Sequence, residues 1–232
     1  MNQEIDLGEI NKIDLEDIKA VFVDIDDTLY SYAESHSVAI EYCYKIFKEY
    51  FSGDLGININ NFEQFEVRYR KARDDVTKRL FPGGSCRSRL LAFKDIFEEI
   101  SCISNISAYK YAIEFEELYW SSLIQSIKPN KEMKSFLEFC QSRIPELIIC
   151  AVSDMQTTYQ IRKLIKLGYG DFALVTSEEV GVEKPNPLIF QYALEKLHLN
   201  PNEVIMIGDS YEKDVDGASK LGIRSFLINI ND

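Results

Sequence analysis

The sequence is poor in the residues that bind zinc or form disulfide bridges. Its 232 residues include only 2 histidines and 5 cysteines, and no two cysteines have the C-x-x-C spacing. A structural zinc site is therefore poorly supplied. Because the number of cysteines is odd and their spacing is irregular, we expect reduced thiols, several of them buried, in a reducing cytosol.

Positive charge is scarce, and long apolar segments are missing. The chain has 26 Lys and Arg against 38 Asp and Glu, a formal net charge of −12. This balance argues against binding to a nucleic acid polymer or an anionic membrane surface, which favour clustered Lys and Arg. No apolar run approaches the roughly 20 residues of a membrane span, and residues 1–18 do not resemble a signal peptide. We expect a cytoplasmic protein with no membrane partner, and the sequence leaves its oligomeric state open.

What the chain does contain is a series of short apolar runs that end abruptly in polar or glycine residues. These runs are at 20–25, 147–152, 172–175, 204–207 and 225–228. Continuous β-branched runs of this length are typical of strands buried on both faces of a parallel sheet. Helical stretches separate the later runs, at 157–167, 187–197 and 211–221. The alternation predicts an α/β fold with a doubly wound, Rossmann-like parallel-sheet core.

The segment between the first two runs is different, because it is aromatic, charged and helical in its periodicity. Helices are expected at 38–51, 61–80, 88–100 and 107–124. A connection of about 95 residues is too long for a simple crossover and indicates an inserted domain. We therefore predict a core of residues 1–30 and 129–232 and an α-helical insertion of residues 31–128. The aromatic stripes Tyr42, Ile46, Tyr50 and Phe62, Phe65, Tyr69 are expected to pack between these helices.

Polar side chains follow the predicted strands, where open α/β sheets bind their ligands. They are Asp24, Asp26, Asp27 and Thr28 after the first run, Ser153 and Asp154 after the second, and Asp209 and Asp214 after the fourth. Lys184 lies in the loop after the third run. Crowded carboxylates repel one another unless a cation neutralises them, and oxygen ligands without His or Cys favour Mg²⁺ over zinc.

Each of these residues also has an ordinary interpretation when it is considered alone. Ser153 would cap a helix, Lys184 would lie on the surface, and Asp214 would be an acid in the first turn of a helix. Their joint placement at strand ends, in an order that one fold brings together, makes coincidence the weaker interpretation. A small phosphorylated metabolite is a compatible ligand despite the acidity, because one bound cation reverses the charge of a site.

These residues fall into four motifs that resemble those of the haloacid dehalogenase superfamily. Asp24-Ile25-Asp26-Asp27-Thr28 matches the D-x-D-x-T motif, and Ser153 closes a strand as in the second motif. Lys184-Pro185 matches the third motif, and Gly208-Asp209-Ser210 followed by Asp214 matches the fourth. The motifs cover nearly the whole chain except the insertion. The chain is therefore identified as similar to phosphatase-type members with an α-helical cap inserted after the first motif.

The resemblance implies a mechanism. Asp24 would be the nucleophile that forms an aspartyl-phosphate, and Asp26 would be the general acid and then the general base. Mg²⁺ would be held by Asp24, Asp209 and the backbone carbonyl of Asp26, while Asp214 would bind the metal through water or orient Lys184. Substrate contacts are expected from Thr28, Tyr30, Arg87, Ser153, Asp154 and Lys184.

The resemblance leaves several reactions to weigh. A Mg²⁺-dependent phosphatase acting on small nucleotide or sugar phosphates is favoured. A sugar phosphomutase similar to β-phosphoglucomutase is the main alternative, although mutases commonly have Glu where this chain has Gly208. A dehalogenase is disfavoured because it has no need of Asp26. A catalytically idle binding protein is disfavoured because Asp24 and Asp209 are both present. A phosphonate-cleaving enzyme would need a cap lysine that forms an imine, and the sequence singles out none of the lysines in the cap.

Substrate choice in such proteins comes from the cap. Cationic candidates around the Pro82-Gly83-Gly84 loop are Lys78, Arg79, Arg87 and Arg89, for which an ordinary solvated basic face is an equally good interpretation. Tyr30 and Tyr32 are expected to line the entrance. His36 stands where mutases often have a helper histidine, but a capping or exposed residue is the simpler interpretation. Two mild departures from the family pattern are Asp27, where Gly is frequent, and Asp154, where Asn is frequent.

Overall fold

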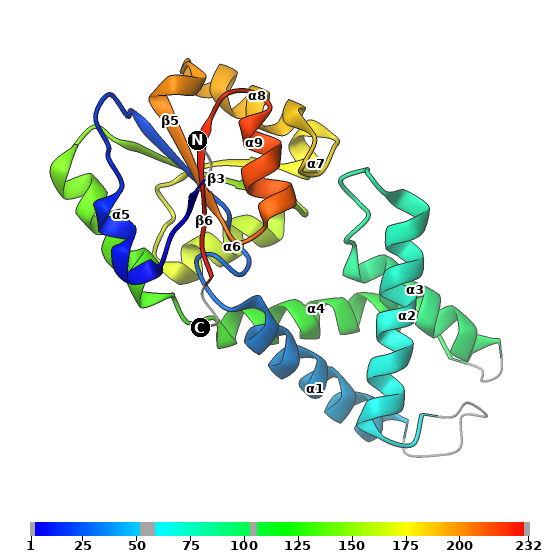
Figure 1. Ribbon diagram of the computed structural model, residues 1–232. Helices are drawn as coiled ribbons and strands as arrows, with labels where there is room; N and C mark the ends of the chain where they lie inside the picture. Colours follow the sequence, from blue (N-terminus) through cyan, green and yellow to red (C-terminus); the bar gives the residue numbers. More distant parts are fainter. Residues whose placement is uncertain (1–2, 52–58, 103–105, 230–232) are drawn as a thin grey trace. The chain divides into compact units, whose positions relative to one another are not determined.

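The computed structural model describes residues 3–51, 59–102 and 106–229. They fall into two compact units, one of Met1–Tyr32 with Ile127–Asp232 and one of Ala33–Ser126 (Figure 1). We call these the sheet unit and the helical unit and describe each by itself. In the described part of the chain, no helix is long and apolar enough to cross a membrane.

The sheet unit is built on a parallel sheet, which within the described residues has six strands in the order β1-β6-β5-β2-β3-β4. The strands are β1 (Gln3–Glu4), β2 (Ala20–Val23), β3 (Ile148–Ser153), β4 (Ala173–Thr176), β5 (Val204–Gly208) and β6 (Arg224–Leu227). The central strand β2 pairs with β3 on one side and β5 on the other, with Val23 opposite Ala151 and Ile207. The α/β fold class predicted from the apolar runs is confirmed, and among the strands described only the two-residue edge strand β1 was not predicted.

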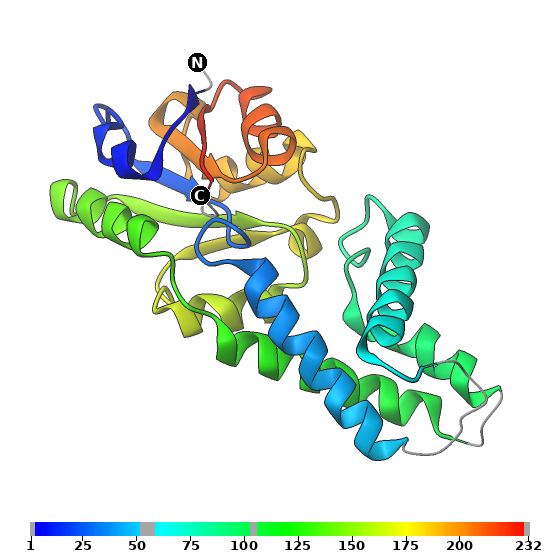
Figure 2. The same cartoon turned by 60° about the horizontal axis from the view of Figure 1, so that its bottom comes forward.

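Helices cover both faces of this sheet. Its helical segments are η1 (Leu7–Lys12), α5 (Lys131–Arg143), α6 (Thr157–Leu167), α7 (Ser177–Val180), α8 (Pro187–Leu197), η2 (Pro201–Glu203), η3 (Tyr211–Asp216) and α9 (Gly217–Ser219). Phe22, Val152 and Met206 pack with α8 and α9 on one face. The alternate strand residues, such as Val21 and Ile207, are also buried. These alternate residues face the other side of the sheet, where right-handed crossovers are expected to place α5 and α6. Figures 1 and 2 show both helices on that side.

Local sequence explains where these helices begin and end. Helix α6 stops at Gly168, which has a left-handed φ of 85° that suits glycine. Helix α8 begins with Pro187 after Asn186, whose side chain accepts a hydrogen bond from the Leu188 N–H. Both helices have the predicted bounds. The predicted helix at 211–221 is shorter and starts with the π-helical turn η3, which places Asp214 over the end of β5.

The helical unit consists of α1 (Tyr32–Tyr50), α2 (Phe62–Leu80), α3 (Arg89–Ser101) and α4 (Ala108–Ser126). Helix α1 starts earlier than the predicted 38–51. Its interior is aromatic, and Phe97 and Phe115 have ring centroids 4.9 Å apart. The stripe through Phe65 and Tyr69 is buried as expected. The other stripe is confirmed only in part, because Tyr50 contacts the rings of Tyr111 and Phe115 in α4 although it is 48% exposed, whereas Tyr42 is 40% exposed.

Candidate active site

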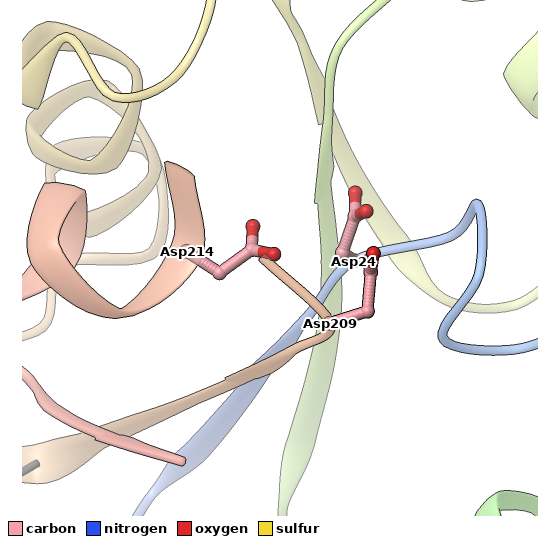
Figure 3. Close-up of side chains that lie close together, drawn as sticks. All are labelled: Asp24, Asp209 and Asp214. Atoms are coloured by element: carbon pink, nitrogen blue, oxygen red, sulfur yellow. The ribbon is translucent and has the colours of Figure 1, made fainter. Parts of the chain in front are cut away.

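Three carboxylates meet at the carboxyl ends of β2 and β5. Asp24 follows β2 directly, Asp209 follows β5 directly, and Asp214 lies in η3. One oxygen of each carboxylate lies within 4.8 Å of the other two. Figure 3 shows the three side chains close together above the strand ends. The parallel sheet thus brings together acids that are far apart in the sequence.

Burial and crowding raise the proton affinity of two of these acids, Asp209 and Asp214. Burial, with the nearby charges of Asp24 and Asp214, raises the pKa of Asp209 to about 7. Burial also raises the pKa of Asp214, which is fully buried. Three carboxylates with oxygen-only donors suit a hard divalent cation, which keeps all of them ionised. The cluster therefore fits Mg²⁺.

Lys184 connects two of the three acids. Its Nζ donates hydrogen bonds to Asp24 at 2.8 Å, to Asp214 at 2.6 Å and to the Val152 carbonyl at 3.0 Å. The side chain is only 1% exposed. Burial alone would lower the pKa of Lys184, but the carboxylates of Asp214 and Asp24 raise it, so the ammonium stays charged. Of the two roles expected for Asp214, the contact that orients Lys184 is present.

Asp154 stabilises the loop that carries Lys184. Its Oδ1 accepts a hydrogen bond from the Lys184 backbone N–H at 2.9 Å, and its Oδ2 accepts one from Lys213 Nζ at 2.9 Å. The carboxylate is 10% exposed and the Lys213 side chain 34%. The acid found in place of the frequent Asn thus comes with a cation that balances its charge.

The loop after β2 explains two further residues of the first motif. Asp27 has a left-handed φ of 58°, which accounts for the frequent Gly at this position and which Asp tolerates better than most residues. Its carboxylate accepts a hydrogen bond from the Tyr32 N–H at 2.8 Å. The sequence predicts a substrate contact for Thr28. Thr28 is instead fully buried, and its hydroxyl donates to Asp209 at 3.2 Å, so it positions this carboxylate.

Ser153 lies at the end of β3 and is 2% exposed. Its hydroxyl accepts a hydrogen bond from the Gln160 side chain at 2.8 Å, and the same amide nitrogen lies 2.7 Å from the Asp154 carbonyl. Gln160 comes from α6 and is fully buried. It therefore orients the second motif from the helix that follows it.

Asp26 is held by two side chains whose contacts the sequence did not reveal. Lys163 Nζ lies 2.6 Å and 2.9 Å from the two carboxylate oxygens of Asp26. The Tyr30 hydroxyl donates to the same carboxylate at 2.5 Å. Tyr30 is fully buried, so the prediction that it lines the entrance is wrong.

Gln160 and Lys163 were missed, although the sequence carries a signal for both. The buried face of α6 consists of Gln160, Lys163, Leu164 and Leu167, which have the spacing of an apolar helix face. Two polar side chains at such positions conflict with the pattern. The conflict indicates that their polar ends have partners at the sheet edge.

The cationic candidates lie in the helical unit and differ in environment. Lys78 and Arg79 belong to the last turn of α2, and Arg79 pairs with Asp95 at 3.1 Å. Arg89 is 1% exposed, lies 5.4 Å from the ring centroids of Tyr119 and Trp120, and donates to the Arg87 carbonyl at 2.7 Å. Arg89 is thus not part of a solvated basic face.

His36 is neither a capping nor an exposed residue, which corrects the simpler interpretation. Its Nδ1 lies 2.9 Å from the Tyr119 hydroxyl, and its ring stacks on Tyr69 with centroids 6.0 Å apart. Burial, reinforced by the charges of Arg89, Arg73 and Arg70, lowers the pKa of His36 to about 4. The imidazole is therefore neutral at neutral pH.

Comparisons with known proteins agree with this geometry. The family model described as haloacid dehalogenase-like hydrolase matches residues 18–222. The chain is 28% identical to ribulose-1,5-bisphosphate 5-phosphatase of Halopiger xanaduensis over 90% of this chain and 84% of that protein. It is 30% identical to glyceraldehyde 3-phosphate phosphatase of Methanopyrus kandleri over 91% and 84%. The crystal structure of a phosphatase of the same family from Thermococcus onnurineus aligns with a TM-score of 0.61 and 25% identity, over 92% and 87% of the two chains.

Proposed function

Because this chain belongs to the haloacid dehalogenase-like hydrolase family, with a match over residues 18–222, we propose that it is a Mg²⁺-dependent phosphatase. It hydrolyses small phosphate monoesters of the sugar phosphate class through an aspartyl-phosphate on Asp24. The observation that carries the proposal is the contact of buried Lys184 with both Asp24 and Asp214, beside Asp209. The two relatives, named for ribulose bisphosphate and glyceraldehyde 3-phosphate, support the sugar phosphate class.

The reaction takes place in two steps at the strand ends. In the first, a carboxylate oxygen of Asp24 attacks phosphorus, the bond to the alcohol oxygen breaks, and Asp26 gives that oxygen a proton. In the second, water attacks the aspartyl-phosphate, the bond to Asp24 breaks, and Asp26 takes the proton from water. Inorganic phosphate and the alcohol are the products.

The charges of the site are arranged for an anionic substrate. Asp24, Asp209 and the Asp26 backbone carbonyl would hold Mg²⁺, which would offset the negative charges of the nucleophile and of the phosphate. Lys184 and Ser153 are proposed to bind the phosphoryl oxygens, where a fixed cation and hydroxyl stabilise developing charge. Under this proposal residues 31–128 are the cap, the domain that selects the substrate.

The test is release of phosphate from a panel of sugar phosphates and nucleoside monophosphates. The wild type is compared with Asp24→Asn and with Asp171→Asn, a matched change at an exposed aspartate outside the site. We expect activity that needs Mg²⁺, disappears with EDTA, is absent in Asp24→Asn and is unchanged in Asp171→Asn.

Four results contradict the proposal. Full activity of Asp24→Asn or activity that is insensitive to EDTA rejects the mechanism. Interconversion of hexose phosphate isomers without free phosphate identifies a mutase instead. Release of fluoride from fluoroacetate identifies a dehalogenase.

A further inference from the structure

Lys163 is a buried cation of the sheet unit that the proposed mechanism does not use. Its side chain is 0% exposed, and its Nζ contacts both oxygens of the Asp26 carboxylate. Its ammonium also lies 5.8 Å and 6.0 Å from the ring centroids of Tyr30 and Tyr32, and 3.9 Å from the sulfur of Met155. These contacts place the ammonium against the Asp26 carboxylate.

Packing alone does not explain a lysine at this position. Lys163 lies on the buried face of α6 beside Leu164 and Leu167, where Leu or Met would fill the space without a desolvation penalty. A buried ammonium is expensive unless it is paired and hydrogen-bonded. A residue that breaks the local pattern, yet contacts both oxygens of one carboxylate, points to a role at that carboxylate.

The contacts fix the orientation of Asp26. Two hydrogen bonds from Lys163 and one from the Tyr30 hydroxyl reach the same carboxylate, whose side chain is 23% exposed. The backbone of Asp26 also forms a β-bridge with Tyr30. A proton-transfer group must lie within hydrogen-bond reach of the proton that it moves, so this fixation places Asp26 for its task.

We propose that Lys163 is a positioning residue that holds the Asp26 carboxylate for attack of water on the aspartyl-phosphate, an inference that rests on the proposed function. In that step the oxygen of water bonds to phosphorus, the bond from phosphorus to Asp24 breaks, and the proton of water passes to Asp26. Lys163 acts through Asp26 and does not touch the reacting atoms. Gln160, one turn earlier on α6, supports Ser153 in the same manner.

The test uses p-nitrophenyl phosphate, whose leaving group needs no general acid. Lys163→Met keeps the length of the side chain without its charge, and Lys166→Met removes an exposed lysine of the same helix as the matched control. In Lys163→Met, we expect formation of the aspartyl-phosphate to stay fast and its hydrolysis to become slow. A burst of nitrophenolate should then precede a steady state about 10²-fold slower than that of the wild type. KM should not rise, and acid quench should trap phosphoenzyme.

Two further variants separate positioning from a merely structural role. Lys163→Arg, which keeps a cation at the carboxylate, should restore part of the rate. In the Asp26→Asn background, Lys163→Met should have no further effect on kcat, because Lys163 acts through Asp26.

The outcomes also separate this inference from the proposed function. Activity in Asp24→Asn overturns the proposed function. An inactive Asp24→Asn together with a Lys163→Met enzyme that has the wild-type rate and no burst overturns the role of Lys163 alone. So does a Lys163→Met effect of equal size in the Asp26→Asn background, or a loss in melting temperature that accounts for the loss of rate.

Discussion

A β-carbon at position 208 would lie 2.3 Å from the carboxyl carbon of Asp214. Asp214 folds back over the end of β5, and the Ser210 N–H donates to its Oδ2 at 3.0 Å. Only glycine leaves room for this approach, and the approach is what allows Asp214 to reach Lys184. The absence of a side chain at 208 is therefore part of the site.

Replacing this glycine tests that relationship. Gly208→Ala should displace Asp214 or the strand end, lower Mg²⁺-dependent phosphate release at least tenfold, and destabilise the fold by about 1–3 kcal/mol, as overpacking does. Gly170→Ala is the control, because a β-carbon there meets only Ile165 at 3.7 Å, an ordinary contact. Phosphate release and urea unfolding of both variants provide the measurement. A Gly208→Ala protein with wild-type activity would show that Asp214 does not need its observed place.

Binding of Mg²⁺ should depend on pH because Asp209 has a pKa of about 7 in the metal-free fold, raised by burial and by Asp24 and Asp214. A carboxyl whose pKa is raised on folding contributes stability at low pH that is lost as pH rises through about 7. Because Mg²⁺ replaces the proton on Asp209, the affinity of the site for Mg²⁺ should fall up to tenfold per pH unit below 7.

Melting temperatures between pH 5 and 8, with EDTA or saturating Mg²⁺, measure this effect. The difference between the melting temperatures with Mg²⁺ and with EDTA should increase with pH, and it should be lost in Asp209→Asn. A constant difference would mean that no proton is displaced from the cluster.

The sequence predicts the sheet and the edge that carries the candidate site well, for a physical reason. Carboxyl ends of parallel strands meet at one edge, so the positions of Asp24, Ser153 and Asp209 follow from the apolar runs before them. Gly208 can be recognised in the sequence as part of the fourth motif, but the approach of Asp214 to this glycine depends on the π-helical turn η3. That turn has no clear sequence pattern.

Other features depend on packing between distant segments, which a single sequence does not contain. The sequence shows that Lys163 interrupts the apolar face of α6, but it does not show that the loop after β2 places Asp26 beside it. His36 looks exposed at the start of α1 until Tyr69 of α2 and Tyr119 of α4 enclose it. Strand β1 spans only Gln3–Glu4, too short for any alternation to show.

His36 should make the fold less stable in mild acid. Burial and the charges of Arg89, Arg73 and Arg70 lower its pKa to about 4 in the folded chain, against 6.5 as the ordinary value. The unfolded chain therefore binds the proton first. The stability that His36 contributes is present above about pH 6.5 and is lost as pH falls toward 4.

The comparison of wild type with His36→Gln, by urea unfolding at pH 7, 5.5 and 4.5, isolates this contribution. As the pH falls, the unfolding free energy of the wild type should decrease relative to that of His36→Gln. His198→Asn, which keeps a residue tolerant of the left-handed end of α8, is the control and should not reproduce the shift. Parallel curves for wild type and His36→Gln would contradict the assignment.

Only one thiol should react rapidly in the folded protein. Burial raises the pKa of Cys140 and Cys150 to about 12 and raises that of Cys43 as well, so these thiols carry almost no reactive thiolate. Cys86 is buried too, whereas Cys102 is exposed. N-ethylmaleimide followed by peptide mass spectrometry should label Cys102 first and the others only in urea. Fast labelling of a second cysteine in native buffer would show that its burial is transient.

The hydrogen bonds of Asp154 to the Lys184 N–H and to Lys213 should differ in energetic importance. The bond to the Lys184 N–H lies in the interior, so Asp154→Ala leaves a buried donor unsatisfied at a cost of about 1–3 kcal/mol. The pair with Lys213 is partly hydrated, since the lysine side chain is 34% exposed, and such pairs contribute about 0–1 kcal/mol. Asp154→Asn keeps an acceptor for the Lys184 N–H but loses the carboxylate charge that faces Lys213 and the Lys184 ammonium.

We therefore expect Asp154→Ala to be clearly less stable than Asp154→Asn in urea unfolding. Lys213→Met leaves the Asp154 carboxylate without this cation and should lower the stability. The double variant Asp154→Asn, Lys213→Met should recover part of the lost stability, because the carboxylate charge that Lys213 balances is then gone. Equal stability of Asp154→Ala and Asp154→Asn would place the importance of Asp154 in its charge. In that case Lys213, rather than the backbone of Lys184, would be the partner that keeps an acid at this position.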